Sequence, residues 1–183
     1  MRRRELAGLA LWPLLGAGAH AADVPDTLRR GRCAVLLRHA STTAGIGDPP
    51  GFTLGQCSTQ RNLSDEGRAQ AQRIGAWFSN RQLKPVATRT SAWCRCRDTA
   101  QLAFGQALHW SPLDSTFENR KLSPAATQAL RGALAALPAG GFEVWVTHQV
   151  NITALTGEFS SMGQGLVVDA AGHVVQTLAF DGA

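Results

Sequence analysis

The 183-residue sequence predicts an α/β protein in which a mainly parallel sheet lies between two layers of helices. Two observations carry this prediction. Short apolar runs, such as 33–37 and 142–146, alternate along the chain with longer segments of helical periodicity. Two further apolar runs, 166–168 and 174–178, are separated by turn residues, which predicts a C-terminal hairpin at the end of the sheet.

Local signals place the individual elements. Ser64 is a typical N-cap, Gly105 is a typical helix stop, and Ser123 followed by Pro124 predicts an N-cap and a first helical residue. The long segment 41–62 is rich in Thr, Gly and Pro and predicts a loop of functional importance. We expect strands over 33–38, 85–91, 108–110 and 142–147, and helices over 64–80, 94–104 and 123–137.

The first 21 residues have the pattern of a secretory signal peptide. Arg2–Arg4 precede an apolar stretch over 6–19 that is too short to span a bilayer, and we expect cleavage after Ala21. Pro13 and several glycines make a membrane anchor less favoured, while the paired arginines leave the general and twin-arginine export routes both open. The mature chain, 22–183, is then expected to form one domain in the periplasm or outside the cell.

Charge and hydropathy exclude two classes of partner. The formal net charge is +5, and part of it lies in the leader. No later run of Lys and Arg is interleaved with aromatic residues, so nucleic acid is not an expected partner. No second apolar stretch has membrane-spanning length, so no membrane span is expected in the mature chain.

The four cysteines predict a disulfide in an exported protein. We expect a bridge from Cys57 to Cys94 or to Cys96, which would hold the long loop near the middle of the domain. A second bridge through Cys33 stays open, because a buried strand also accepts cysteine as a small hydrophobic residue. A zinc site is disfavoured, because the spacing of Cys94 and Cys96 is shorter than the usual ligand spacing.

Polar residues follow the ends of three predicted strands. Taken alone, Arg38-His39 is better explained by a structural salt bridge, but Arg89–Ser91 and Thr147-His148 end two other strands. Carboxyl ends of parallel strands share one edge of a sheet, where ligands bind. Arg95, in a helix whose N-terminal N–H groups would face the same edge, adds another cation. This convergence predicts a site for an oxyanion such as phosphate.

Four segments resemble the motifs of the histidine phosphatase superfamily, which also contains the cofactor-dependent phosphoglycerate mutases. They are Leu-Leu-Arg-His-Ala at 36–40, the segment 62–71, the segment 90–100, and Val-Thr-His-Gln-Val-Asn-Ile-Thr at 146–153. The resemblance extends from Val35 to the final hairpin and implies a phosphoglycerate mutase-like, three-layer α/β/α fold.

The resemblance also implies a role for each matching residue. His39 would be the nucleophile that forms a phosphohistidine, and its second ring nitrogen would bond a backbone carbonyl. The side chains of Arg38, Arg95 and His148 would hold the phosphoryl oxygens. Thr42 and the backbone N–H of Gln149 would add further contacts. No metal or other cofactor is expected, because the arginines supply the positive charge.

The general acid is less clearly defined. Gln149 follows the second histidine where phytase-like members have Asp, so the acid is expected from the region between the second and third motifs. Glu118 is our candidate, with Asp114 and Asp48 as alternatives, and a solvent-facing role for Glu118 is equally consistent with the sequence.

These features predict an exported, metal-independent phosphatase that acts on a phosphomonoester or a phosphohistidine. The expected partner is a small phosphorylated substrate, with a cell-envelope sugar phosphate as one candidate. A mutase is less favoured for an exported chain with short insertions. The alternative is a non-catalytic module that binds phosphate or a phosphosugar on the same fold.

Overall fold

The computed structural model describes residues 23–106 and 108–180. The predicted signal peptide, 1–21, lies outside the described residues. The helices are α1 (Val24–Arg30), α2 (Asp65–Asn80), α3 (Cys94–Phe104), α4 (Ser123–Ala135) and α5 (Gln149–Thr156), with short 3-10 helices at η1 (Cys57–Thr59), η2 (Ser111–Leu113) and η3 (Arg120–Leu122). The strands are β1 (Cys33–Arg38), β2 (Ala87–Thr90), β3 (Leu108–His109), β4 (Phe142–Thr147), β5 (Gly165–Asp169) and β6 (Val174–Leu178).

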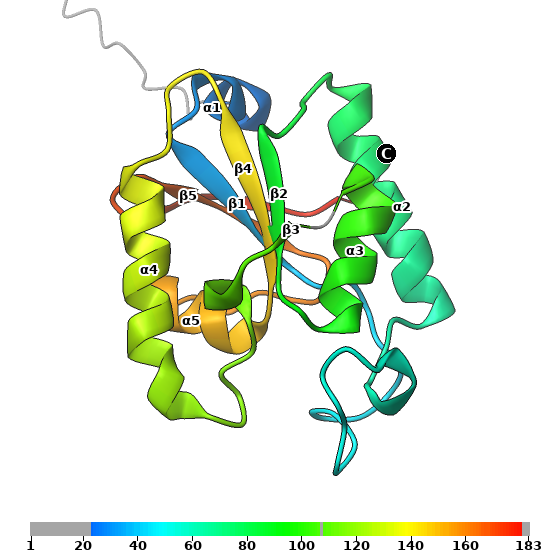
Figure 1. Ribbon diagram of the computed structural model, residues 1–183. Coiled ribbons are helices and arrows are strands. Elements are labelled where there is room, and N and C mark those ends of the chain that lie inside the picture. The colour runs from blue at the N-terminus through cyan, green and yellow to red at the C-terminus, as the bar shows by residue number, and fades with distance from the viewer. Residues whose placement is uncertain (1–22, 107, 181–183) are drawn as a thin grey trace, which may run out of the picture.

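The strands form one six-stranded sheet in the order β3-β2-β4-β1-β5-β6. The pairs β1–β4, β2–β4 and β2–β3 are parallel, whereas β5 pairs antiparallel with both β1 and β6. The predicted mainly parallel sheet with a C-terminal hairpin is therefore confirmed. Because β1, β2 and β4 run in the same direction, their carboxyl ends meet at one edge (Figure 1).

Helices cover both faces of the sheet, as Figure 1 shows with α2 and α3 on one side and α4 and α5 on the other. The first hydrophobic core lies under α1, α2 and α3, where Val35, Val144, Ile74 and Phe78 are buried together. The second core lies under α4 and α5 and contains the fully buried Trp145. The predicted three layers are confirmed, and the strands are apolar because both of their faces are covered.

Two predicted helix boundaries have different outcomes. Ser64 caps α2 as predicted, because its side chain accepts a hydrogen bond of 3.1 Å from the N–H of Gly67. The prediction that Ser123 is an N-cap is wrong: Ser123 has helical dihedral angles and is the first residue of α4, preceded by Leu122. The 3-10 turn of η3 runs directly into α4, so the helical backbone begins before the serine. Helices α1 and α5 were not predicted from the sequence.

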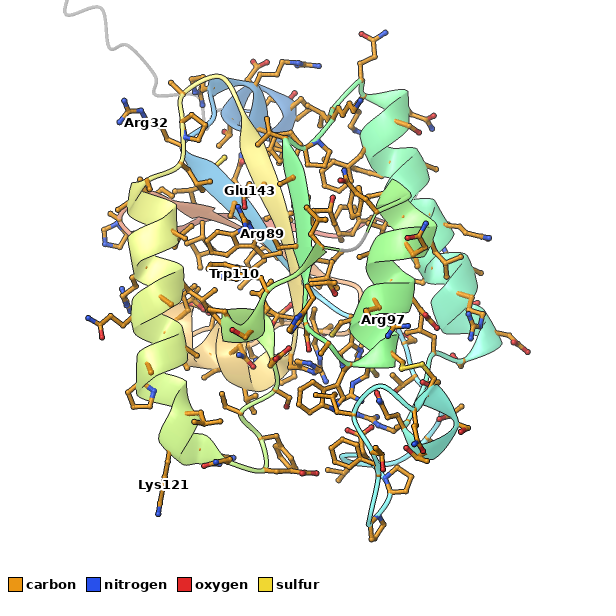
Figure 2. The ribbon with its side chains drawn as sticks, in the orientation of Figure 1. Arg32, Arg89, Arg97, Trp110, Lys121 and Glu143 are labelled. Atoms are coloured by element: carbon orange, nitrogen blue, oxygen red, sulfur yellow. A yellow bond between two sulfur atoms is a disulfide. The ribbon has the colours of Figure 1, made fainter. Side chains whose placement is uncertain are left out.

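A polar cluster between β2 and β4 has a structural role. Arg89 donates two hydrogen bonds, of 2.6 and 3.1 Å, to the carboxylate of Glu143, and its guanidinium lies 5.1 Å from the ring centroid of Trp110 (Figure 2). The hydrogen bonds from Arg89 keep the pKa of Glu143 below its usual value even though burial alone would raise it. Arg89 is thus held in an ion pair, and Arg97 is exposed on α3 (Figure 2).

The long loop is fastened to the start of α3 by a disulfide between Cys57 and Cys94. This is the first of the two pairings expected for Cys57. Cys33 and Cys96 are free and buried, so no second bridge forms. Burial raises the pKa of the Cys33 thiol to about 11, which keeps it protonated.

No helix in 23–106 or 108–180 is long and apolar enough to cross a membrane.

Candidate active site

A pocket of about 310 Å³ opens at the carboxyl edge of the parallel strands. Its inner end is formed by polar residues from three elements: Arg38 and His39 at the end of β1, Arg95 in α3, and His148 between β4 and α5. The structure therefore brings together the four side chains that the sequence motifs singled out. Arg61, Glu118 and Gln149 line the same pocket.

His39 is buried, with 3 % of its surface exposed. Its Nδ1 lies 2.9 Å from the carbonyl oxygen of Ala40, and a carbonyl can only accept, so Nδ1 carries the proton and donates it. Nε2 is then unprotonated and has its lone pair available. The predicted hydrogen bond to a backbone carbonyl is thus present.

Burial lowers the pKa of His39 to about 3, against the opposing effect of the bond to Ala40. The positive charges of Arg95, Arg38 and Arg61 lower it further. The imidazole is consequently neutral at any physiological pH, which is the state that a nitrogen nucleophile needs.

His148 is the second buried imidazole, with its ring centroid 5.6 Å from that of His39. Its Nε2 lies 2.8 Å from Oγ of Ser91, and its Nδ1 lies 3.5 Å from a guanidinium nitrogen of Arg95. A guanidinium nitrogen only donates, so Nδ1 accepts and Nε2 carries the proton. Burial lowers the pKa of His148 well below its ordinary value, so it too is neutral.

Arg95 forms an ion pair with Asp48 that was not predicted from the sequence. Its guanidinium donates a 2.8 Å hydrogen bond to Asp48, and both side chains are only 5 % exposed. The same carboxylate accepts hydrogen bonds of 2.9 Å from the indole of Trp93 and from the backbone N–H of Arg61. Burial alone would raise the pKa of Asp48, but these hydrogen bonds hold it below its usual value. Asp48 is thus ionised and fully engaged, which is incompatible with a role as general acid.

Arg61 adds a third guanidinium to the pocket. It donates hydrogen bonds of 2.8 Å to Oγ1 of Thr42 and to the carbonyl oxygen of Gly45, which fix its position. Local sequence signals do not predict the path of the loop that carries Arg61, so its place in the pocket comes from the structure. Thr42 supports Arg61 and is not among the residues that line the pocket.

Each of the three arginines in the pocket has a hydrogen-bond donor without a partner among the described residues. The Nε atoms of Arg38, Arg61 and Arg95 are all buried without a hydrogen-bond partner in the described structure. Buried unpaired donors are costly, and three of them around one pocket indicate an anion-binding site. With Asp48 opposing one of the three charges, the inner end of the pocket suits a dianion such as a phosphate monoester.

The candidate acids occupy different environments. Glu118 is exposed at the pocket wall and makes no hydrogen bond or ion pair with the residues that the structure describes. Asp114 accepts a 2.7 Å hydrogen bond from the N–H of Ala92 and lies near His109, outside the lining of the pocket. Of the three carboxylates considered from the sequence, only Glu118 both lines the pocket and has no hydrogen-bond partner among the described residues.

Two helices begin at this edge of the sheet. The N–H of Cys94, at the start of α3, donates a 3.0 Å hydrogen bond to Oε1 of Gln60, so this one amide is not open to an anion. Helix α5 begins at Gln149, so the backbone N–H of Gln149 lies in a first turn, where amides have no partner within the helix.

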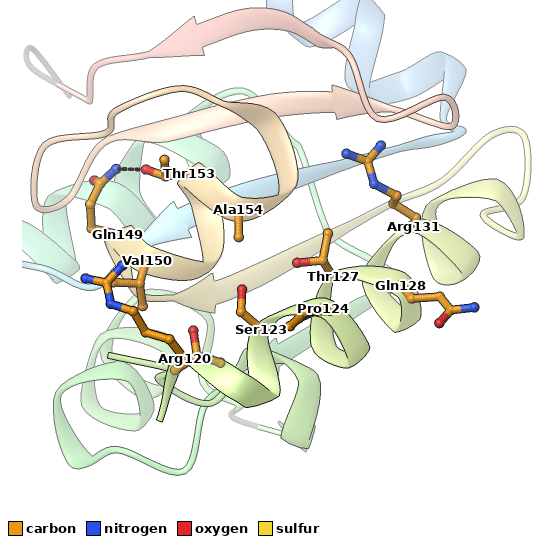
Figure 3. Close-up of a pocket in the computed structure, with 11 residues that line it drawn as sticks. Arg120, Ser123, Pro124, Thr127, Gln128, Arg131, Gln149, Val150, Thr153 and Ala154 are labelled. Atoms are coloured by element: carbon orange, nitrogen blue, oxygen red, sulfur yellow. Dashed lines mark hydrogen bonds between the residues drawn. The ribbon is translucent and has the colours of Figure 1, made fainter. Parts of the chain in front are cut away.

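A larger groove, of about 800 Å³, adjoins the pocket at Gln149 and Val150, which line both. It runs between α4 and α5, with Arg120 at the end nearer Gln149 and Arg131 farther along α4 (Figure 3). The amide of Gln149 donates a 2.7 Å hydrogen bond to Thr153 within this groove (Figure 3). Among the described residues, no cluster of three or more His, Cys, Asp or Glu side chains could hold a metal ion.

Comparisons with known proteins agree with this geometry. The sequence profile of the histidine phosphatase superfamily (branch 1) matches residues 34–116, which include Arg38, His39 and Arg95. The matched segment confirms the resemblance to the histidine phosphatase superfamily that the motifs indicated, and the solved structures confirm the phosphoglycerate mutase-like fold.

Several solved structures share the fold. A candidate phosphohistidine phosphatase SixA from Agrobacterium tumefaciens is 22 % identical, with a TM-score of 0.52 over 80 % of this chain and 97 % of that one. The protein histidine phosphatase SixA in complex with tungstate is 13 % identical, with a TM-score of 0.52 over 81 % and 97 % of the two chains. A mycobacterial glucosyl-3-phosphoglycerate phosphatase is 19 % identical, with a TM-score of 0.53 over 75 % and 90 %. No protein with a curated description matches the chain in sequence.

Proposed function

We propose that this chain is an exported, metal-independent phosphatase that hydrolyses a small phosphomonoester or a phosphohistidine through a covalent intermediate on His39. The observation that carries the proposal is the state of His39, which is buried and neutral, with Nδ1 bonded to Ala40 and Nε2 free. The match of residues 34–116 to the histidine phosphatase superfamily supports the reaction class. The proposed domain is the mature chain, 22–183.

The first step transfers the phosphoryl group to the enzyme. The lone pair of Nε2 of His39 attacks phosphorus, and the bond from phosphorus to the leaving oxygen breaks. Glu118 in its protonated form gives its proton to that oxygen, so the product leaves as an alcohol. Arg38, Arg61 and Arg95 neutralise the charge on the equatorial oxygens, and His148 lies beside them with its Nε2 proton donated to Ser91.

The second step releases phosphate. The carboxylate of Glu118 takes a proton from a water molecule whose oxygen attacks phosphorus, and the phosphorus–nitrogen bond breaks. The electron pair returns to Nε2 of His39, which is neutral again, and Glu118 is protonated for the next cycle. The backbone N–H of Gln149 is a further proposed contact of the phosphoryl group, and Thr42 contributes by holding Arg61.

Hydrolysis of p-nitrophenyl phosphate by the mature protein tests the proposal. We expect turnover that vanadate inhibits, because vanadate mimics the five-coordinate transition state. His39→Ala should abolish turnover. Undetectable turnover by a folded protein that still binds vanadate would support the non-catalytic phosphate-binding alternative instead.

Glu118→Gln tests the proton donor separately. Nitrophenolate is a good leaving group that needs little protonation, whereas an alkoxide needs a full proton. We expect the variant to slow an alkyl phosphate by at least tenfold more than p-nitrophenyl phosphate. An equal effect on both substrates would remove Glu118 from the role of general acid.

Location and substrate form the last part of the proposal. The disulfide between Cys57 and Cys94 is typical of oxidising compartments and supports a periplasmic or secreted protein. Detection of the mature chain, beginning after Ala21, in the periplasmic or extracellular fraction would test export. A cell-envelope sugar phosphate is one candidate within the class of small phosphorylated substrates.

A further inference from the structure

Five of the side chains that line the catalytic pocket are apolar. They are Ile46, Trp93, Phe117, Val150 and Met162, which we term the apolar rim. They come from separate parts of the chain, so no single secondary-structure element imposes their position. Ligand pockets commonly combine such walls with a few polar groups that orient the ligand, and here the cationic groups and the two histidines form the phosphate end.

Two residues of the apolar rim are exposed at a cost in solvation. Ile46 is 92 % exposed and Phe117 is 46 % exposed. Phe159, next to the pocket, is 70 % exposed and places its ring 5.7 Å from the guanidinium carbon of Arg38. Exposed apolar side chains that surround one pocket indicate a binding surface, whereas scattered ones need no explanation.

The exposed position of Ile46 is fixed by its neighbours. The carbonyl of Gly45 accepts a hydrogen bond from Arg61, and the carboxylate of Asp48 pairs with Arg95. A Cβ atom added at Gly47 would lie 3.7 Å from Cε1 of Phe117, so Phe117 faces this loop. The segment around Ile46 is thus tied down on both sides.

The pocket offers little to a leaving group rich in hydroxyls. Ser115 and Gln149 are the uncharged hydroxyl and amide side chains among its described lining residues. The oxygen of Gln149 accepts from the N–H of Ser160, and its nitrogen donates to Thr153. Oγ of Ser115 accepts a 3.3 Å hydrogen bond from the N–H of Phe117. Among the described lining residues, a sugar in this position would find only Ser115 and Glu118 as side chains free to bond its hydroxyls, so most of these would lose water without an equivalent hydrogen bond.

From this juxtaposition of an anion-binding inner end and an apolar rim, we infer that the substrate is a phosphomonoester whose leaving group is apolar, either an alkyl or an aryl alcohol. The inference rests on the proposed function, because it assumes that the phosphoryl group lies at His39. It also means that a sugar phosphate would be a poorer substrate than an alkyl phosphate of similar size. Alkyl and aryl leaving groups share the same chemistry of recognition, and the experiment below separates them.

The test measures kcat/KM for a series of n-alkyl phosphates from ethyl to hexyl, and for phenyl phosphate, glycerol 3-phosphate and glucose 6-phosphate. Each added methylene should raise kcat/KM by about two- to fourfold until the apolar rim is filled. The kcat/KM values for glycerol 3-phosphate and glucose 6-phosphate should be lower than that for butyl phosphate by about tenfold or more. The ratio of phenyl to hexyl phosphate reports whether the rim favours a flat ring or a flexible chain.

Variants assign the effect to the rim. Ile46→Ser combined with Phe117→Ser should lower kcat/KM for hexyl phosphate by about tenfold or more and leave ethyl phosphate and vanadate inhibition within about twofold. Leu122→Ser is the matched control, because Leu122 is 57 % exposed and lies outside the lining of the pocket. It should change none of these values.

Three outcomes would overturn the inference: no gain in kcat/KM with chain length, an unchanged gain in the double variant, or faster turnover of the sugar phosphates. The last outcome, if abolished by Arg120→Ala, would show that the groove between α4 and α5 binds a polar leaving group instead. Failure of the proposed function is distinguishable, because it would appear as no vanadate-sensitive turnover of any phosphate in the series.

Discussion

The buried, neutral state of His39 makes the stability of the protein depend on pH in a predictable direction. In the unfolded chain the imidazole has a pKa of about 6.5. In the folded protein burial lowers the pKa to about 3. Between these two values the unfolded state binds a proton that the native state does not, so stability falls as the pH falls from about 6.5 towards 3.

The size of this effect follows from the two pKa values. Between pH 8 and pH 5, His39 alone should lower the free energy of unfolding by about 2 kcal/mol. His148 adds a change in the same direction, because burial also lowers its pKa. Urea unfolding followed by tryptophan fluorescence at pH 8 and pH 5 measures the sum.

His39→Asn isolates the contribution of His39. An asparagine amide can still donate to the carbonyl oxygen of Ala40, as Nδ1 does, but it does not titrate. We expect the loss of stability between pH 8 and pH 5 to be smaller in the variant by about 2 kcal/mol. An equal loss in both proteins would mean that His39 is protonated in the folded state at pH 5, and the argument for a neutral nucleophile would be refuted.

Three further predictions concern the surroundings of the site. Asp48→Asn leaves the buried charge of Arg95 without its counterion, so it should lower the free energy of unfolding by about 2 to 4 kcal/mol. Added inorganic phosphate should raise the melting temperature of this variant more than that of the parent, and an equal rise would contradict the pairing. Arg61→Ala removes one of three guanidiniums and should weaken vanadate inhibition by about tenfold to a hundredfold, while Arg120→Ala should not; equal inhibition in all three proteins would exclude Arg61 from the anion site. Reduction of the disulfide, which closes a separation of 37 residues, should cost about 3 to 4 kcal/mol, or roughly 10 °C in Tm. A Cys57→Ser, Cys94→Ser double variant should melt at the lower temperature with or without reductant, and an unchanged Tm of the parent on reduction would contradict the prediction.

The sequence predicted the inner end of the site because its residues lie at strand ends. Arg38 and His39 follow an apolar run, and His148 follows another, so parallel pairing of β1 with β4 places them at one edge. Periodicity and topology are sufficient for such residues. Glu118 was also selected from the sequence and lines the pocket, although its role stays a prediction.

The roles of Asp48 and Arg61 could not be derived in the same way. Both residues lie on the long loop, whose path depends on the disulfide at Cys57 and on the ion pair with Arg95. Such contacts link residues far apart in sequence and leave no local periodic signal. An acidic and a basic residue in a long polar loop, with a cysteine between them, were the available hints.

Helix α5 was missed for a different reason. Its eight residues include the β-branched Val150, Ile152 and Thr153, which have low helix propensity. The helix forms because Ile152 and Leu155 are buried against the second core, so tertiary packing outweighs local preference. The apolar rim could not be predicted from the sequence either, because its residues come from separate segments that only the fold brings together.

The central claim is that Nε2 of His39 carries the phosphoryl group during turnover. Rapid quenching of the mature protein with p-nitrophenyl phosphate at high pH, followed by peptide mass spectrometry, tests it most directly. We expect one added phosphoryl group on the peptide that contains His39, stable to base, lost in acid, and absent from His39→Asn. Turnover with the phosphoryl group on another residue, or undiminished turnover by His39→Asn, would contradict the account.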